Sequence, residues 1–334
     1  MPTTIRDVAR AAGVSVTAAH RALNEKAELS PDKRARVLAA ARQLNYVPSA
    51  AARALVSGKT GTIGMVVTDN ASPVYAGIVR GVEEAANAAG FGLLLCNSGD
   101  SQERAIACLD LLRAKQVDGI LLTPVQTDRR DIERLSESGV PFVLLLRHFA
   151  DIDADFVITD NAAGGYAVTA HLLGLGHRRI GHLAGPPFVS SAQGRAAGYR
   201  QALAEWGVPF REDLLVHAPF TVGDAYDAAF ALLDRPDRPT AVFAANDVQA
   251  VGVMKAARAL GLKIPDELAL VGGDDIELAE FLEVPLTTFH QPAREIGSLG
   301  AQILLDRLRG EQAEPRRIVL TPRLIVRRSS GGVR

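Results

Sequence analysis

Charged and amide side chains stand directly after short apolar runs at several points of this sequence. Arg147, Asn246 and Asp274 each occupy such a position, and Arg195 opens a segment with a helical pattern. Because ligands of open α/β sheets bind outside the carboxyl ends of the strands, groups in these positions are expected to converge on one cleft. Paired hydrogen-bond donors and acceptors in a cleft suit a polyhydroxylated ligand such as a sugar.

The same residue types also allow simpler roles. Asp247 and Asp275 each suit a helix cap, and Arg147 is placed to form a structural ion pair with Asp160. Two arginines in one cleft leave an acidic sugar or a sugar phosphate open as the ligand.

Motifs for catalysis or cofactor binding are incomplete. The stretch 58–60 resembles the end of a phosphate-binding loop, but Arg53 occupies the position of the required first glycine. The stretch 174–176 lacks the third glycine of a dinucleotide-binding turn, because position 179 is arginine. The histidines show no metal-ligand spacing, and no nucleophile elbow is present. We therefore expect no enzyme activity, no cofactor and no metal.

The charge of the chain is unevenly distributed. The 334 residues have a formal net charge of -1. Residues 1–60 hold 10 Lys and Arg against 4 Asp and Glu, a net +6, and the remainder holds 27 against 34, a net -7. A basic segment on an acidic body is typical of a small module that binds a polyanion.

The sequence also bears on the compartment. Two cysteines exclude a disulfide framework, and Cys96, within an apolar run, is expected in the core. No signal peptide and no apolar stretch long enough for a membrane helix is found. These features predict a soluble cytoplasmic protein.

The basic segment has the pattern of a helix–turn–helix. Apolar residues recur at helical spacing over 5–12, Gly13 interrupts them, and further helices are expected over 16–23 and 31–44. The second helix of such a motif enters the DNA major groove with its first residues. The alternative is a three-helix interaction domain without a DNA role. The side chains directed toward DNA would be Val16, Thr17 and Arg21.

Residues 49–56 form a segment of a different kind. They have high helix propensity over only about two turns, and helices this short are marginal in water. Residues 57–61 interrupt the pattern. We expect a helix here that forms only when a partner packs against it.

From residue 62 onward apolar strands alternate with helices, which is typical of parallel sheets covered on both faces. The expected strands are 63–67, 93–96, 119–122, 142–146 and 157–159, then 180–183, 214–217, 241–244 and 268–272. The expected helices are near 74–89, 101–115, 129–138, 162–175, 191–206, 222–233 and 247–260. The predicted fold class is an all-α helix-turn-helix head plus α/β, with two doubly wound parallel-sheet lobes.

Longer motifs connect these parts. The head contains Thr4-Ile-x-Asp-Val-Ala-x-x-Ala-Gly-Val-Ser15, Arg21-x-Leu-Asn24 and Leu44-Asn-Tyr-x-Pro48. The body contains Gly176-His-Arg-x-Ile180, Asn246-Asp247, Asp274-Asp-Ile276 and Pro285-Leu-Thr-Thr288. From residue 4 to about 328, this set resembles the lactose-repressor (LacI) family of bacterial transcription regulators. The resemblance implies lobes of the periplasmic-binding-protein type.

The domain bounds expected on this basis follow the chain. They are a helix-turn-helix domain at 1–48, a hinge helix at 49–60 and a two-lobed effector-binding and dimerisation domain at 61–330. Lobe 1 is expected at about 61–160 and 291–320, and lobe 2 at about 161–290 and 321–330.

The resemblance gives the short helix a role. In this family a hinge helix from each protomer enters the minor groove, and a leucine, here Leu55, wedges between base pairs and kinks the DNA. His20 stands where the family usually has a small hydroxyl residue, so the operator sequence does not carry over from relatives. The expected DNA-binding residues are Val16, Thr17, His20, Arg21, Asn24, Ser30, Ser49, Ala52, Arg53 and Leu55.

The resemblance also implies a small effector between the lobes. Phe220 matches an aromatic residue that stacks on a sugar face. Val74 replaces a frequent aromatic, which argues against a purine held by paired rings, and Leu146 replaces a common aspartate. The expected effector-binding residues are Asp69, Tyr75, Arg147, Asp160, Arg195, Phe220, Asn246 and Asp274.

The function expected is that of a sequence-specific DNA-binding repressor, homodimeric and controlled by a sugar, a sugar acid or another sugar derivative. The chain ends without a leucine heptad, which argues against a tetramer made by its tail. One alternative is a solute-binding protein of a transporter, which would need a signal peptide and no head. The other is a sugar-modifying enzyme, which would need a base and a nucleophile in the pocket.

Overall fold

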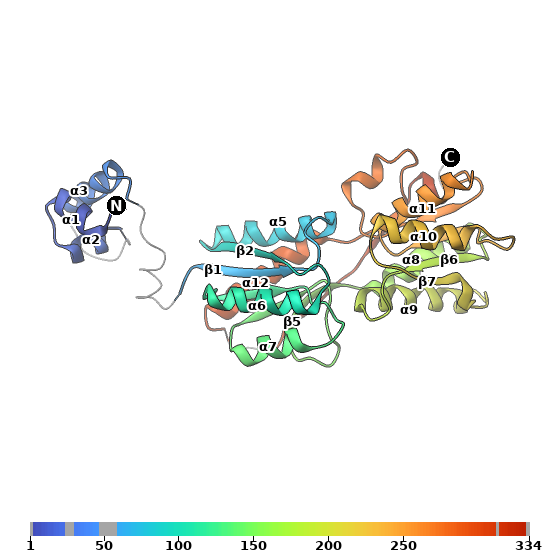
Figure 1. Cartoon of the computed structure of the whole chain (residues 1–334), viewed down its shortest axis with the longest axis horizontal. Coiled ribbons are helices and arrows are strands. Elements are labelled where there is room, and N and C mark those ends of the chain that lie inside the picture. Colours follow the sequence, from blue (N-terminus) through green and yellow to red (C-terminus); the bar gives the residue numbers. More distant parts are fainter. Residues whose placement is uncertain (1–2, 24–29, 47–58, 312–313, 332–334) are drawn as a thin grey trace. The chain divides into compact units, whose positions relative to one another are not determined.

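The computed structural model describes residues 3–23, 30–46, 59–311 and 314–331. The chain divides into two compact units, residues 1–61 and 62–334, each with its own hydrophobic core. Figure 1 shows helices alone in the smaller unit and two groups of strands and helices in the larger one. No helix in the described ranges combines the length and the apolar composition that a membrane span requires.

The smaller unit is a three-helix bundle. Its helices are α1 (Ile5–Ala12), α2 (Val16–Leu23) and α3 (Pro31–Gln43). The backbone N–H and the hydroxyl of Thr4 donate to Asp7 at 3.0 and 2.6 Å, which stabilises the start of α1 and holds the pKa of Asp7 below its usual value. Gly13 ends α1 with φ +63°, a conformation that glycine adopts without strain. Val8 and Ala19 are fully buried at the centre.

Lobe 1 of the larger unit is built on a six-stranded parallel sheet in the order β11-β5-β4-β3-β1-β2. Its strands are β1 (Thr62–Val67), β2 (Gly92–Asn97), β3 (Gly119–Leu122), β4 (Phe142–Leu145), β5 (Asp155–Thr159) and β11 (Arg317–Leu320). The covering helices are α5 (Pro73–Ala88), α6 (Gln102–Ala114), α7 (Arg130–Ser138) and α12 (Ala293–Leu308). Met65 packs with α5 and α12 and the next residue, Val66, with α6, so the two sheet faces carry separate cores.

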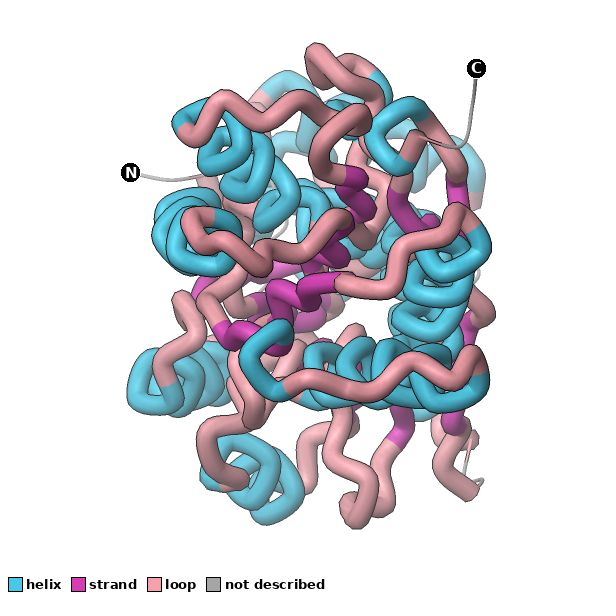
Figure 2. Tube along the Cα trace, turned by 90° about the vertical axis from the view of Figure 1, so that its right-hand side faces the viewer, coloured by secondary structure: helices cyan, strands magenta, loops and turns pink. Residues whose placement is uncertain are grey.

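Lobe 2 has a four-stranded parallel sheet in the order β7-β6-β8-β9 and an antiparallel pair β10-β12. Its strands are β6 (Ile180–Ala184), β7 (Leu215–His217), β8 (Ala241–Ala244), β9 (Ala269–Val271), β10 (Thr288–His290) and β12 (Arg323–Ile325). Its helices are α8 (Asn161–Gly174), α9 (Ser190–Glu205), α10 (Val222–Leu233) and α11 (Asp247–Ala259), with short 3₁₀ turns η1 (Glu212–Leu214), η2 (Glu277–Glu280) and η3 (Arg328–Ser330). Helices surround the strands in the view of Figure 2.

The chain passes between the two lobes at three places. These are the links from β5 to α8, from β10 to α12 and from β11 to β12. Strand alternation alone did not predict α12, β10, β11 or β12. In β11, exposed residues alternate with half-buried ones, so this edge strand lacks the continuous apolar run that marks the central strands.

Strand β2 departs from the expectation of a buried strand. It lies at the edge of its sheet, and Leu94 and Leu95 are 39% and 40% exposed. Cys96 is half-buried rather than central, and burial raises the pKa of its thiol to about 11. An apolar run therefore marked the strand but not its position in the sheet.

Candidate DNA-binding head and effector pocket

Helix α2 presents an exposed face. The hydroxyl of Ser15 accepts a hydrogen bond from the Ala18 N–H at 3.1 Å, which stabilises the start of the helix. Ala19 and Ala22 are buried against the other two helices. Because these alanines fill the inner face, the opposite face is open to a partner. The exposed residues that the sequence predicted as DNA contacts are Val16, Thr17, His20 and Arg21.

Ser30 is exposed directly before α3. The remaining predicted DNA-binding residues lie outside the described residues, and their roles stay predictions. They are Asn24, Ser49, Ala52, Arg53 and Leu55.

A pocket of about 420 Å³ is lined by residues of both lobes at the carboxyl ends of their strands. Lobe 1 contributes Arg147 after β4, and lobe 2 contributes Asn246 after β8 and Asp274 after β9. Seven of the eight predicted effector residues line it, and the exception is Asp160.

Arg195 of α9 is the centre of the polar wall on lobe 2. The side chain is 4% exposed and donates from Nε to Asn161 Oδ1 at 2.9 Å. Its Nη2 donates to Asp274 Oδ1 at 3.2 Å and to Gln291 Oε1 at 3.4 Å, and its Nη1 donates to the backbone carbonyl of Ala245. These bonds compensate its buried charge and hold the guanidinium in one orientation.

Arg195 reaches Asn161 because α8 and α9 pack closely. A Cβ atom at Gly165 would overlap the backbone of Arg195, and one at Gly198 would overlap the carbonyl of Ala162. The two glycines therefore let the helix backbones approach each other, and this approach brings the guanidinium to the pocket.

Asn246 and Asp274 keep open hydrogen-bonding positions. Asn246 Oδ1 accepts from the Gln249 N–H at 2.8 Å and caps α11, whereas Nδ2 has no hydrogen bond to the described residues. Asp274 Oδ1 accepts from Arg195 and from Gln291, whereas Oδ2 accepts from none of the described side chains. Burial raises the pKa of Asp274 to about 6, and Arg195 opposes that shift.

Arg147 occupies the lobe 1 wall and is 3% exposed. Its Nη1 donates to Asp100 Oδ1 at 2.7 Å and to the Pro124 carbonyl at 3.3 Å. The ion pair between Arg147 and Asp160 that the sequence left open is therefore wrong. Asp160 instead caps α8, where Oδ1 accepts from the Ala163 N–H at 2.9 Å, and this places it away from the pocket lining.

A glutamine bridges the two lobes beside the pocket. Gln126, in the loop after β3, accepts a hydrogen bond from the Ser190 N–H of lobe 2 at 2.9 Å and donates to the His148 carbonyl at 2.7 Å. The His148 N–H donates in turn to the Ser190 hydroxyl at 3.4 Å. The pocket is lined by Leu146, two residues before His148, and by Val189, directly before Ser190.

The comparisons with known proteins agree with this geometry. Residues 4–49 match the model of bacterial regulatory proteins of the lacI family, and residues 169–330 match a periplasmic binding protein-like domain. The ribose operon repressor of Escherichia coli (strain K12) is 38% identical over 98% of this chain and 99% of its own length. The chain belongs to the LacI family. The transcriptional repressor PurR of Photobacterium profundum is 36% identical over 98% of both chains.

Solved structures of the family extend the match. The lac repressor dimer bound to operator and the anti-inducer ONPF has a TM-score of 0.89 at 26% identity and 99% coverage of both chains. The transcriptional regulator CelR in complex with cellobiose has a TM-score of 0.77 at 36% identity, covering 98% of this chain and 99% of its own. This LacI-family chain is thus a DNA-binding transcription regulator rather than an enzyme, which confirms the resemblance and the fold class read from the sequence.

The structure corrects the helix-cap interpretation of two aspartates. Asp247 is the first residue of α11, but its side chain accepts from the Thr288 hydroxyl at 2.6 Å and the Ile276 N–H at 2.9 Å. Asp275 forms an ion pair with Arg327 at 2.8 Å. Both carboxylates join distant segments of lobe 2, Asp247 from the start of α11 and Asp275 from the positive-φ backbone after β9.

Two of the pocket residues that sequence reasoning missed bond to the predicted ones. Gln291 is 3% exposed and lies on the link between β10 and α12, where it bonds to Arg195 and Asp274. Asp100 carries the countercharge of Arg147. Gln291 follows no long apolar run, so strand-end position gave no signal for it, whereas Asp100 lies in the loop after the expected strand 93–96 and could have been found by its position.

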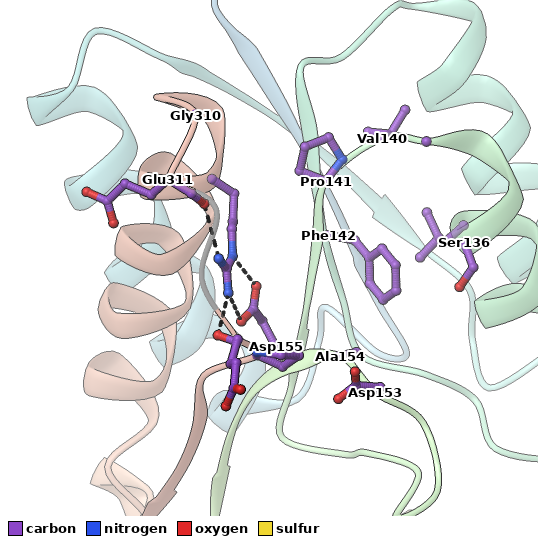
Figure 3. A pocket seen from close by; sticks show the side chains of 14 residues that line it. Ser136, Val140, Pro141, Phe142, Asp153, Ala154, Asp155, Gly310 and Glu311 are labelled. Carbon is purple, nitrogen blue, oxygen red and sulfur yellow. Dashed lines mark hydrogen bonds and ion pairs between the residues drawn. The ribbon is translucent and has the colours of Figure 1, made fainter.

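A second hollow, larger than the pocket between the lobes, lies at the amino ends of the lobe 1 strands (Figure 3). Its volume is about 840 Å³, and it is lined where β4 and β5 begin, at Phe142 and Asp155. Arg307 Nε donates to Asp155 Oδ2 at 2.8 Å, and Arg307 also bonds to the carbonyls of Glu311 and Glu314. These groups form hydrogen bonds with one another and join α12 to β5. We therefore assign them a structural role.

Proposed function

We propose that this LacI-family regulator binds a near-palindromic operator as a homodimer in the cytoplasm and acts as a repressor controlled by a sugar or sugar derivative in the pocket. The observation that carries the effector role is the buried wall of Arg195, Asp274 and Gln291, which is internally bonded yet leaves Asp274 Oδ2 and Asn246 Nδ2 for a ligand. The relatives support it, since solved family structures hold cellobiose and ribose.

Control of DNA binding follows from linkage. An effector that touches both walls favours one angle between the lobes, and only a difference in affinity for the two angles can shift DNA binding. Gln126 and Ser190, which join the lobes beside the pocket, lie where such a change of angle must break or form bonds.

The homodimer has a candidate surface on lobe 1. Leu94 and Leu95 of the edge strand β2 and Leu111 of α6, a helix that packs against β2, are exposed. Exposed apolar patches of this kind mark protein–protein interfaces. Two heads joined by a two-fold axis would read two related half-sites.

The DNA role predicts salt-sensitive binding to DNA upstream of the protein's own gene. In a mobility-shift assay, raising salt from 50 to 200 mM should weaken binding by at least about tenfold, because phosphate contacts release counterions. Leu55→Ala should remove most of the preference for the operator over random DNA while leaving weak non-specific binding. Unchanged operator preference in this variant would contradict the wedge role, and absence of any shift would contradict the DNA role.

The effector role predicts a separable variant. Asn246→Asp keeps the oxygen that caps α11 but removes the Nδ2 donor, so operator binding should persist while the effector response falls by at least about tenfold. Gln201→Ala, a change at an exposed residue of α9, serves as the control. If operator binding by Asn246→Asp responds to the effector at the same concentration as the wild type, the effector site lies elsewhere.

A further inference from the structure

Gln249 is a buried glutamine of α11 that does not itself line the pocket. Its backbone N–H donates to Asn246 Oδ1 at 2.8 Å, the bond that caps the helix. Its side-chain Nε2 donates to two backbone carbonyls, that of Ala218 at 3.1 Å and that of Pro219 at 3.0 Å. A single residue therefore joins the start of α11 to the loop that follows β7.

That loop carries an aromatic side chain of the lobe 2 wall. Phe220 and the preceding residue, Pro219, both line the pocket. The Ala218 N–H donates to the Ala184 carbonyl at 3.0 Å, which ties the loop to the end of β6. A Cβ atom at Gly185 would overlap the aromatic ring, so the ring lies directly on the backbone there. The position of the ring therefore depends on how firmly the loop is held.

Helix α11 reaches the loop because it packs closely on α10, which begins where the loop ends. A Cβ atom at Gly252 of α11 would overlap the carbonyl of Val222 at the start of α10. Thr221 caps α10, where its hydroxyl accepts from the Asp224 N–H at 3.2 Å. The glutamine holds the loop before Phe220, and the cap of α10 holds it after that residue.

The side chain of Gln249 is an unfavourable choice for the fold alone. Its Oε1 is buried and has no hydrogen-bond partner among the described residues. A buried acceptor without a partner loses free energy relative to an apolar side chain of similar shape. Methionine would fill the same volume without that loss. Stability of lobe 2 therefore does not account for a glutamine at this position, whereas its two hydrogen bonds to the loop do.

We infer that Gln249 is a positioning residue that fixes the ring of Phe220 relative to the amide of Asn246 before an effector binds. Its N–H holds the amide through the cap of α11, and its side chain holds the ring through the two loop carbonyls. A wall already in its binding conformation loses less entropy when a ligand arrives, so the arrangement tightens effector binding. This consequence rests on the proposed effector role of the pocket, whereas the ordering of the ring does not.

Fluorine NMR of the full-length protein, labelled with 4-fluorophenylalanine, tests the ordering without a ligand. The Phe220 resonance is assigned by its absence from Phe220→Leu. Gln249→Met keeps the backbone N–H and the side-chain length but removes both side-chain donors, so this resonance should shift and broaden or split. Gln201→Met, the same change at an exposed position of α9, should leave it unchanged.

A Phe220 resonance that keeps its shift and width in Gln249→Met would overturn the inference. Gln249→Leu, which lacks the donors in a different shape, should change the resonance as well. Urea unfolding of both variants identifies one that does not fold, and the other then decides the outcome.

Calorimetry with cellobiose and with D-ribose tests the consequence for binding. Solved structures of the family hold these two sugars. For a sugar that binds the wild type, Gln249→Met should weaken binding by about fivefold or more, the factor that corresponds to one hydrogen bond. In a Phe220→Ala background the same change should have much less effect, because the ring that Gln249 positions is absent. Equal weakening in both backgrounds would contradict a role through Phe220.

The two measurements separate the inference from the proposed function. A changed fluorine spectrum with no binding of either sugar would support the ordering by Gln249 and count against a sugar effector of this kind. Binding of a sugar with an unchanged spectrum would support the effector role and overturn the inference.

Discussion

At the scale of single residues, Asp247 has the most perturbed electrostatics next to the pocket. Burial, and then the neighbouring carboxylate of Asp274, raise the pKa of Asp247 to about 8. Hydrogen bonds from Thr288 and from the Ile276 N–H oppose the shift without cancelling it. Asp247 is therefore largely protonated at neutral pH in the folded protein, while the unfolded chain carries it ionised.

This difference predicts a pH-dependent stability. Because the folded pKa lies above the unfolded value, the folded state holds an extra proton between about pH 4 and pH 8, and stability is lost as pH rises through that window. Asp247→Asn lacks this proton exchange. Between pH 6 and pH 9, its unfolding free energy should fall by on the order of 2 kcal/mol less than that of the wild type.

Urea unfolding at several pH values measures the effect. Asp227→Asn, at an exposed position of α10, is the matched control and should follow the wild type. Parallel pH profiles for Asp247→Asn and the wild type would contradict an elevated pKa at Asp247.

At the scale of elements, the start of α9 connects the pocket to the lobe interface. Ser190 bonds across the lobes to Gln126, and Arg195, about one and a half turns later, anchors the polar wall. The same helix therefore carries both the interlobe contact and the central cation. A ligand that moves the pocket walls must also act on the interlobe contact, since the helix moves as one rigid piece.

Gln126→Ala tests that coupling. Gln126 does not line the pocket, so its loss removes the interlobe hydrogen bond from the Ser190 N–H and the bond to the His148 carbonyl while the pocket lining stays. The one interlobe hydrogen bond that is lost, at about 1 kcal/mol, predicts a two- to tenfold change in operator affinity. Mobility shift in the absence of effector measures it, with Gln201→Ala as control. Equal operator affinity in Gln126→Ala and the wild type would show that the bridge does not bias the lobes.

At the scale of the whole molecule, assembly decides whether two heads act together. Leu94 and Leu95 are successive residues of β2 and so point to opposite faces of the sheet, yet both are about two-fifths exposed. The edge of the sheet is thus incompletely covered on both faces. A second copy of the chain would cover it.

The double variant Leu94→Asp with Leu95→Asp should dissociate the dimer, because a charged group in an apolar interface is costly to desolvate. Sedimentation should show a monomer, and operator affinity should fall by about 100-fold or more, because one head contacts only half of the operator. Leu175→Asp, at a leucine of lobe 2 that is 41% exposed, should stay dimeric. A dimer formed by the double variant would move the interface to another surface.

Local signals in the sequence were sufficient to predict much of the secondary structure and of the pocket. Period-3.6 spacing and caps marked α1, α2 and α3, and apolar runs marked the central strands of both sheets to within a few residues. Residues after those strands, such as Arg147, Asn246 and Asp274, do converge on one pocket. The motifs also placed the chain in its family, which the relatives confirm.

Long-range pairing was decided only by the tertiary structure. Arg147 bonds to Asp100, which is 47 residues away, rather than to Asp160. Gln291 reaches the pocket from the link between β10 and α12, which follows no long apolar run. The same holds for β2, whose leucines are exposed because it lies at the edge of the sheet. Periodicity and caps are properties of neighbouring residues, so they are readable along the chain. Which buried charge meets which partner depends on how whole elements pack, and the chain order does not contain that geometry.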